Sequence, residues 1–332
     1  MYRRLVFVAF ALAFVVVVFG AYVRLNDAGL GCPDWPGCYG HATVPQAQAM
    51  GAAAQDQFPG RGLEPRKAWI EMIHRYLAGT LGLLILAIAI LAWRRAWSNS
   101  STRVPWPQTI LVALVAFQAA LGMWTVTLLL KPAIVTLHLL GGMLTLSLLA
   151  WLALREITWR PLPHAVVAAK WRPWAMLALA VAFCQILLGG WVSTNYAALA
   201  CTDFPTCHGT FAPPADYRHG FHMFRELGMS PEGTPLSNEA LNAIHWTHRI
   251  GAVLTLLLVG GVGTATLRPD RLRPFALLVL VALALQIGIG ISNVLFLLPL
   301  GLAVAHNAGA ALLLTALLML NFRLSHRHAS PV

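Results

Sequence analysis

Four histidines inside apolar segments are the residues of this chain best placed to do chemistry. They are His74, His138, His248 and His306. An ionisable side chain in a segment that can cross a membrane indicates a functional site. A single histidine of this kind has an ordinary explanation, which is a hydrogen bond between two helices. Four such histidines in two matched pairs favour a shared role as ligands.

The role that these histidines predict is bis-imidazole ligation of two hemes, one in each half of the chain. Imidazoles from two facing helices commonly hold a heme iron between them. We therefore expect His74 to pair with His138, and His248 to pair with His306. Zinc is the alternative, but each half lacks a further intramembrane set of cysteines or acids, Glu71 excepted.

Glu71 and two arginines add charge to the same apolar segments. Glu71 lies three residues before His74, so the two side chains share one helix face. Arg75 and Arg249 each follow a predicted ligand, near the expected outer boundary of the membrane. Two interpretations of these arginines remain open, an ion pair with heme propionates and contact with lipid headgroups.

Two Cys-x5-Cys motifs lie in long polar loops and predict two local disulfides. The expected pairs are Cys32–Cys38 and Cys201–Cys207. The prediction follows from their expected position outside the membrane, where conditions are oxidising. A structural role and a redox role both remain open, and zinc binding with His41 or His208 is a third alternative. Cys184 lies inside an apolar segment and is expected to be an ordinary buried thiol.

Eight apolar segments of about 20 residues, the length that spans a bilayer, must position these side chains. They cover residues 5–23, 69–93, 106–130, 133–154, 174–194, 243–267, 275–298 and 302–322. With 58% hydrophobic and only 11% charged residues, the chain is predicted to be an all-α polytopic membrane protein. The lysines and arginines that give the chain its net charge of +11 lie between the apolar segments. This placement favours a lipid bilayer as the partner and argues against nucleic acid.

The chain contains an internal repeat. Residues 20–38 (GAYVRLNDAGLGCPDWPGC) and 189–207 (GGWVSTNYAALACTDFPTC) align without a gap. The membrane histidines match in the same order, His74 with His248 and His138 with His306. A repeat of this kind predicts a duplicated unit of four spans.

The two halves, residues 1–160 and 161–332, are expected to form pseudo-symmetric four-helix bundles of the same orientation, because four spans are an even number. Fourteen lysines and arginines fall on one side of the membrane with two acids, whereas the other side has seven basic and nine acidic residues, with Glu71, Arg75 and Arg249 left out as intramembrane. The basic side is therefore predicted to be cytoplasmic. We expect both termini on that side of the cell's inner membrane, with the first apolar segment retained as part of the repeat.

Together these motifs resemble the heme A synthase family. The resemblance rests on GLGCPDWPGC, on E-x-x-H-R at residues 71–75, on the second His-Arg pair at 248–249, and on His138 and His306. It implies an enzyme that oxidises a porphyrin methyl group of heme O to the formyl group of heme A, for use by terminal oxidases. It also implies a resident heme b in one half and the substrate heme in the other, with a heme O synthase as the partner that supplies heme O.

A difference between the halves assigns the two sites. The second half has His245 at the position of Glu71, so only the first half offers a carboxylate on the ligand face. A carboxylate beside a porphyrin can relay protons or stabilise positive charge. We therefore assign the first histidine pair and a catalytic Glu71 to the substrate, and the second pair, His248 and His306, to heme b.

Two other functions fit part of the pattern. A diheme b-type cytochrome would only pass electrons, and Glu71 argues against it because an electron carrier needs no acid at the porphyrin edge. A heme transporter or chaperone needs a path through the membrane, whereas the four histidines are expected at one depth near the outer face. The sequence leaves open the electron donor, the source of oxygen and the oligomeric state, a homo-oligomer included.

Overall fold

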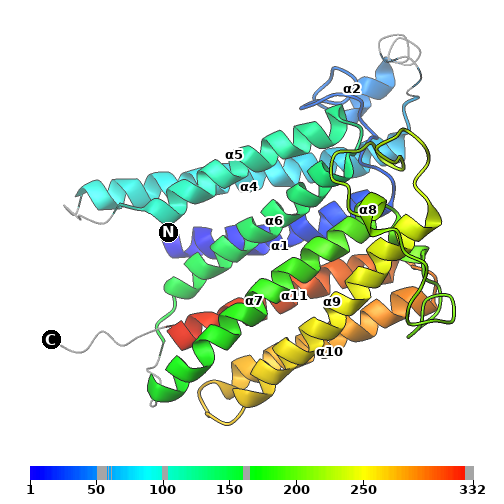
Figure 1. Ribbon diagram of the computed structural model, residues 1–332. Coiled ribbons are helices and arrows are strands. Elements are labelled where there is room, and N and C mark those ends of the chain that lie inside the picture. The colour runs from blue at the N-terminus through cyan, green and yellow to red at the C-terminus, as the bar shows by residue number, and fades with distance from the viewer. Residues whose placement is uncertain (51–57, 59, 61, 99–103, 160–164, 326–332) are drawn as a thin grey trace. The chain divides into compact units, whose positions relative to one another are not determined.

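The computed structural model of the protein is helical (Figure 1). The structure describes residues 1–50, 58, 60, 62–98, 104–159 and 165–325. The elements in chain order are α1 (Tyr2–Leu25), α2 (Val44–Ala49), α4 (Pro65–Ser98), α5 (Trp106–Thr127), α6 (Pro132–Arg155), α7 (Ala165–Thr194), η1 (Ala197–Leu199), α8 (Tyr217–Gly220), α9 (Asn238–Ala265), α10 (Arg273–Leu295) and α11 (Leu300–Ser325). No β-strand forms in these ranges, which confirms the predicted all-α class.

Eight helices in the described ranges are long and apolar enough to cross a membrane, as predicted. They are α1, α4, α5, α6, α7, α9, α10 and α11. Several extend beyond the apolar segments. The helix α4, for example, begins at Pro65 and ends at Ser98, whereas the apolar segment covers 69–93. A helix can continue into a polar stretch because it satisfies its own backbone hydrogen bonds. The chain is a multi-pass membrane protein.

Other spans end earlier than their apolar segments. The helix α5 ends at Thr127, inside the predicted segment 106–130. Leu129 has a positive φ of 52° and the amide of Leu130 donates to the carbonyl of Thr125, which is the Schellman arrangement that terminates helices. The helix α10 ends in the same way. Hydropathy cannot locate such an end, because the residues of the turn are themselves leucines.

The helices form two compact units. The first comprises residues 1–149 and 223–231, and the second comprises residues 150–222 and 232–332. In the first unit α4 packs on α1 and α5, and α6 lies beside α5 and α1. In the second unit α7 packs on α9 and α11, and α10 packs on the same two helices. The predicted boundary at 160/161 falls outside the described residues, and the pseudo-two-fold relation stays a prediction.

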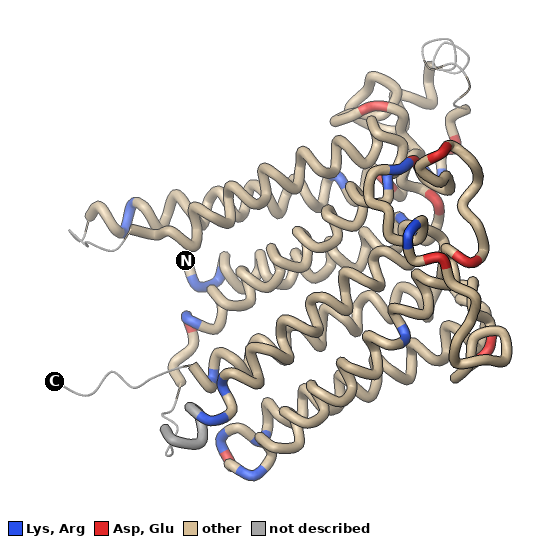
Figure 2. Tube along the Cα trace, viewed as in Figure 1, with Lys and Arg blue, Asp and Glu red and all other residues tan. Residues whose placement is uncertain are grey.

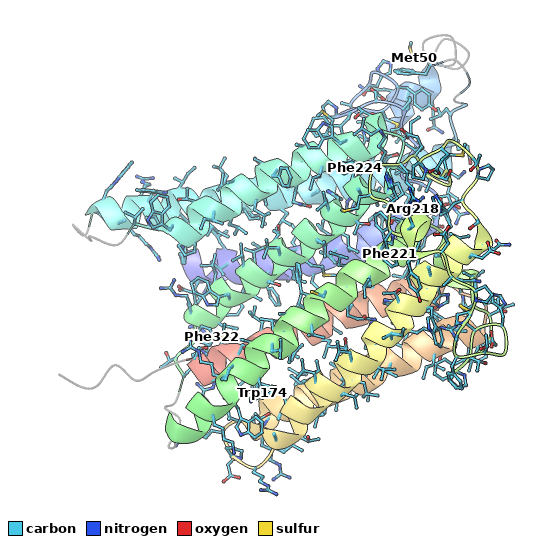
Figure 3. All side chains as sticks on the ribbon, viewed as in Figure 1. Met50, Trp174, Arg218, Phe221, Phe224 and Phe322 are labelled. Carbon is cyan, nitrogen blue, oxygen red and sulfur yellow. A yellow bond between two sulfur atoms is a disulfide. The ribbon has the colours of Figure 1, made fainter. Side chains whose placement is uncertain are left out.

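All four membrane-spanning helices of the second unit contribute to one core. It includes Ala178 of α7, Val259 of α9, Leu283 of α10 and Leu317 of α11, all buried. Small residues such as alanine let transmembrane helices approach closely. Trp174 and Phe322 lie toward the end of this unit away from its long loop (Figure 3). The second unit is thus a packed four-helix arrangement.

Charge is distributed unequally along each unit. Most Asp and Glu residues lie at the end that carries the long loop, and the opposite helix ends carry mainly Lys and Arg (Figure 2). Four of the basic residues in this charge pattern, Arg61, Arg103, Arg160 and Arg327, and one acid, Asp56, lie outside the described residues. The asymmetry agrees with the sequence pattern, and the assignment of each side to a compartment stays a prediction.

The long loop of the second unit contains an ion pair that responds to pH. Nδ1 of His219 lies 2.5 Å from Oδ2 of Asp216, and its Nε2 lies 3.4 Å from Oε2 of Glu232. The hydrogen bond with Asp216, together with both negative charges, raises the pKa of His219 above its ordinary value of 6.5. The pair therefore contributes fully to stability below pH 6.5, and this contribution is lost as the pH rises through the raised pKa.

We expect amide hydrogen exchange of α8, which carries His219, to accelerate as the pH rises above 6.5 and through the raised pKa of His219, beyond the intrinsic dependence of exchange on pH. The variant His219→Gln should lack this additional acceleration because its side chain does not titrate. Exchange measured by mass spectrometry on both proteins checks this. Identical pH profiles for the two proteins would contradict the prediction.

Candidate functional site

The first unit brings together His74 of α4 and His138 of α6, and the two rings are close enough to interact electrostatically. Each ring lies against a glycine of a neighbouring helix. A Cβ atom added at Gly20 of α1 would meet Cε1 of His74 at 3.1 Å, and one at Gly122 of α5 would meet Cε1 of His138 at 3.4 Å. The absence of side chains at these glycines lets the rings lie between helices.

The second unit repeats the arrangement with His248 of α9 and His306 of α11, which also interact electrostatically. A Cβ atom added at Gly189 of α7 would meet Cε1 of His248 at 3.1 Å, and one at Gly290 of α10 would meet Cε1 of His306 at 2.9 Å. The sequence placed the histidines in these pairs, and the structure brings each pair together. Their role as iron ligands stays a prediction.

The surroundings of the four rings fit ligands of a heme iron. Nδ1 of His74, His138 and His306 is buried and lacks a hydrogen-bond partner within the described part of the chain. Buried polar nitrogens normally have a partner. Two imidazoles from different helices in each unit are the ligand set that bis-histidine heme sites use. Both cysteine pairs are oxidised, so they offer no thiolate for the alternative of zinc.

Disulfides join Cys32 to Cys38 and Cys201 to Cys207, which confirms both predicted pairs. An aspartate inside each ring orders the loop. Asp203 accepts hydrogen bonds from the hydroxyl of Thr206 and from the amides of His208 and Gly209. These bonds, the one from Thr206 foremost, hold the pKa of Asp203 well below its usual range. In the first loop the matching Asp34 accepts from the amides of Tyr39 and Gly40.

Glu71 and Arg75 attach the first disulfide loop to α4. Oε2 of the buried Glu71 accepts from the amide of Cys32 at 2.8 Å, and its Oε1 lies 2.5 Å from Nη2 of Arg75. Nη1 of Arg75 donates to the carbonyls of Asp34, Pro36 and Gly37. We call this pair of residues and its contacts the first loop clamp. It connects the helix of His74 directly to the disulfide ring.

His245 and Arg249 form the equivalent clamp of the second unit. The amide of Cys201 donates to Nδ1 of the buried His245 at 3.3 Å, and Nε of Arg249 lies 3.3 Å from Nε2 of the same ring. The guanidinium of Arg249 also donates to the carbonyls of Cys201, Asp203 and Thr206. Glutamate in one unit and histidine in the other therefore perform the same anchoring task.

The structure gives the partners of Glu71, Arg75 and Arg249, which the sequence left open. Glu71 lies one helical turn from His74, as predicted, and both of its oxygens are hydrogen-bonded within the protein. Arg75 and Arg249 donate mainly to loop carbonyls, an arrangement that neither proposed interpretation of them anticipated. Pairing of the arginines with heme propionates stays a prediction. The i,i+4 spacing of Glu71 and Arg75 was the available signal for the ion pair.

Two neighbouring residues of α7, Cys184 and Gln185, lie in positions that the sequence did not predict. Cys184 is exposed on α7 and is not the buried thiol that we expected, because its position on the helix faces outward from the unit. Gln185, its neighbour, turns into the second unit, where its Nε2 lies 3.0 Å from Nδ1 of His248. The repeat did not reveal Gln185, because the matching residue of the first half is Val16.

A family model described as the cytochrome oxidase assembly protein COX15-CtaA matches residues 3–318. The chain belongs to this family. The heme A synthase of Shewanella oneidensis is 44% identical over 316 residues, covering 95% of this chain and 94% of the relative. The heme A synthase of Caulobacter vibrioides is 30% identical over 332 residues, covering 93% and 91%. That of Halalkalibacterium halodurans is 29% identical over 240 residues, covering 71% and 72%.

Proposed function

We propose that the protein is a heme A synthase, which oxidises a porphyrin methyl group of heme O to the formyl group of heme A for cytochrome oxidase assembly. The family match and the near full-length relatives support this reaction. The observation that carries the proposal is the pairing of one histidine from each of two helices inside both units. Two such pairs are what a protein needs to hold one resident heme and one heme substrate.

In this proposal His248 and His306 hold a resident heme b, and His74 and His138 hold the iron of heme O. When bound, heme b supplies one-electron redox chemistry. Each of the four rings lies between helices against a glycine, so the two histidine pairs would set the orientation of the porphyrins that they hold. The glycines leave room for the imidazole rings themselves, since a Cβ atom at any of the four would lie 2.9–3.4 Å from a ring Cε1.

Glu71 is proposed as the catalytic acid–base residue of the substrate side. It lies on the same helix as His74 and one turn away, and its position is fixed by Arg75 and by the amide of Cys32. Oxidation of a methyl group removes protons as well as electrons, and a carboxylate one helical turn from His74 could accept the protons. The same carboxylate can stabilise positive charge in the transition state. The second unit has no acid at this position.

The cellular setting follows from the charge pattern. We propose the inner membrane, with both termini and the basic helix ends in the cytoplasm and the disulfide loops outside. Heme O arrives from a heme O synthase in the same membrane. The apolar substrate is expected to reach His74 and His138 from the bilayer.

Histidine variants in the two units test the proposal by separating heme retention from product formation. His248→Ala and His306→Ala are expected to lose the low-spin heme b absorption of the purified protein. His74→Ala and His138→Ala are expected to retain it and to lose heme A formation when expressed with heme O synthase. The measurements are absorption spectra and chromatography of extracted hemes.

Two outcomes would contradict the assignment. Undiminished low-spin heme b in both His248→Ala and His306→Ala would show that the resident heme lies elsewhere. Normal heme A from His74→Ala, at matched protein level, would remove the first unit from the reaction and favour a diheme cytochrome.

A further inference from the structure

Three glutamines occupy the space above glycines of neighbouring helices. A Cβ atom added at Gly141 of α6 would lie 1.8 Å from Nε2 of Gln118 of α5. Added Cβ atoms at the corresponding glycines of the second unit would lie 2.2 Å and 2.3 Å from glutamine oxygens. These contacts join Gly251 of α9 to Gln185 of α7, and Gly309 of α11 to Gln286 of α10. Contacts this short do not occur between real atoms, so each glutamine requires its glycine.

Each of these glycines follows a membrane histidine by three residues. The histidine–glycine pairs are His138 with Gly141, His248 with Gly251, and His306 with Gly309. Residues three apart lie on one helix face, so the amide lies beside the imidazole. Nε2 of Gln185 is 3.0 Å from Nδ1 of His248, and Nε2 of Gln286 is 3.3 Å from the His306 ring.

The arrangement is reciprocal between the two helices. The glycine that receives each histidine ring lies four residues after the glutamine on the same helix. The pairs are Gln118 with Gly122, Gln185 with Gly189, and Gln286 with Gly290. One helix of each pair thus carries a glutamine followed four residues later by a glycine, and the other carries a histidine followed three residues later by a glycine. The glutamine packs on the glycine of the histidine helix, and the histidine packs on the glycine of the glutamine helix. We call this the glutamine lock.

The pair formed by α1 and α4 has only half of the lock. Gly20 receives the ring of His74, as in the other three pairs. The glutamine position is Val16, and the second glycine position is Leu77. The ring of His74 instead stacks near Phe19, with ring centroids 6.5 Å apart. An aliphatic and an aromatic neighbour give the imidazole no directional hydrogen bond.

We propose that Gln118, Gln185 and Gln286 are positioning residues that fix the imidazoles of His138, His248 and His306, and that the unlocked His74 is the ligand that yields during heme exchange. Hydrogen-bond contacts from Gln185 and Gln286 fix the tautomer and rotation of the rings of His248 and His306. Nε2 of Gln118 makes no hydrogen bond within the described residues, so this glutamine restricts His138 by packing on Gly141. In the second unit both proposed ligands, His248 and His306, have a glutamine lock. In the first unit only His138 has one. This inference rests on the proposed function and adds a physical reason why one site retains heme and the other turns it over.

Release of heme from the protein loaded at both sites tests the inference without reference to catalysis. Protein reconstituted with hemin is mixed with excess heme-scavenging protein, and release is followed by absorption. Two phases are expected, a fast one from the first unit and a slow one from the second. The single variants His306→Ala and His74→Ala identify the phases, because each removes one.

Gln185→Leu is expected to accelerate only the slow phase by about tenfold or more, which is the usual effect of losing a partner of a metal ligand. Gln185→Glu is expected to retain slow release and to lower the midpoint potential of that heme. A carboxylate oxygen accepts from the protonated Nδ1 of an iron-bound ring, as the amide oxygen of Gln185 does after a half-turn of the amide group. A purely space-filling role predicts the opposite order, because leucine is apolar and a buried glutamate is unfavourable. Gln108→Leu, at a glutamine that bonds Tyr2 instead of a histidine, is the matched control.

The double variant Val16→Gln with Leu77→Gly installs the missing half of the lock. It is expected to slow only the fast phase by about tenfold relative to Leu77→Gly alone, which controls for glycine in a helix. Unchanged fast release in the double variant, together with unchanged slow release in Gln185→Leu, would overturn the inference. Should the double variant fail to fold, Gln118→Leu and Gln185→Leu decide alone, with faster release expected from both. Protein that binds no hemin at either site would instead overturn the proposed function.

Discussion

Glu71→His is expected to keep the first disulfide loop anchored and to reduce heme A formation on the order of a hundredfold or more. His245 already fills the same position in the second unit, where its Nδ1 accepts from the amide of Cys201 and its Nε2 lies 3.3 Å from Nε of Arg249. An imidazole can therefore replace the carboxylate as an anchor, but it does not carry negative charge. The substitution separates the structural task of Glu71 from the chemical one.

The measurement is chromatography of hemes extracted from cells that also express heme O synthase, at matched protein level. Peptide mapping without reductant reports whether the Cys32–Cys38 bond and its loop remain intact. The reciprocal variant His245→Glu is the control, since it alters the second clamp and leaves the first unchanged. Near-normal heme A from Glu71→His would confine Glu71 to anchoring and remove it from the mechanism.

Arg249→Ala is expected to free the second disulfide loop from α9 while the disulfide itself persists. The guanidinium donates to the carbonyls of Cys201, Asp203 and Thr206 at 2.7, 2.8 and 2.6 Å. Hydrogen bonds from a charged donor contribute about 1.5–3 kcal/mol each. Loss of all three should therefore speed amide exchange in residues 201–207 on the order of a hundredfold or more.

Hydrogen exchange with mass spectrometry measures this effect. Arg249→Lys is the matched comparison, because an ammonium group keeps the charge but cannot present the planar fork that reaches three carbonyls. It should show intermediate exchange. Exchange in Arg249→Ala that equals the unaltered protein would mean that the disulfide ring alone orders the loop. Arg75→Ala should in addition reduce heme A formation, because it releases Glu71 as well as the first loop.

Features set by local pattern were predictable from the sequence. Hydropathy and length located the eight spans, because the bilayer imposes the same apolar length on every crossing helix. Cys-x5-Cys in a polar outer loop predicted both disulfides, because only six residues separate the partners. The repeat predicted which histidines pair, because duplicated units place equivalent residues at equivalent positions.

Contacts made to backbone atoms were decided only by the tertiary structure. The partners of Arg75 and Arg249 are mainly carbonyls of the loops, and a carbonyl is present at every residue, so no sequence signal marks the ones that are used. The exposure of Cys184 and the inward position of Gln185 likewise depend on how α7 is rotated against its neighbours. The sequence by itself determined that four histidines lie in membrane helices. The packing of glutamine on glycine, a contact between two helices, places an amide against the rings of His248 and His306, and the tertiary structure gives His74 no such neighbour among the described residues.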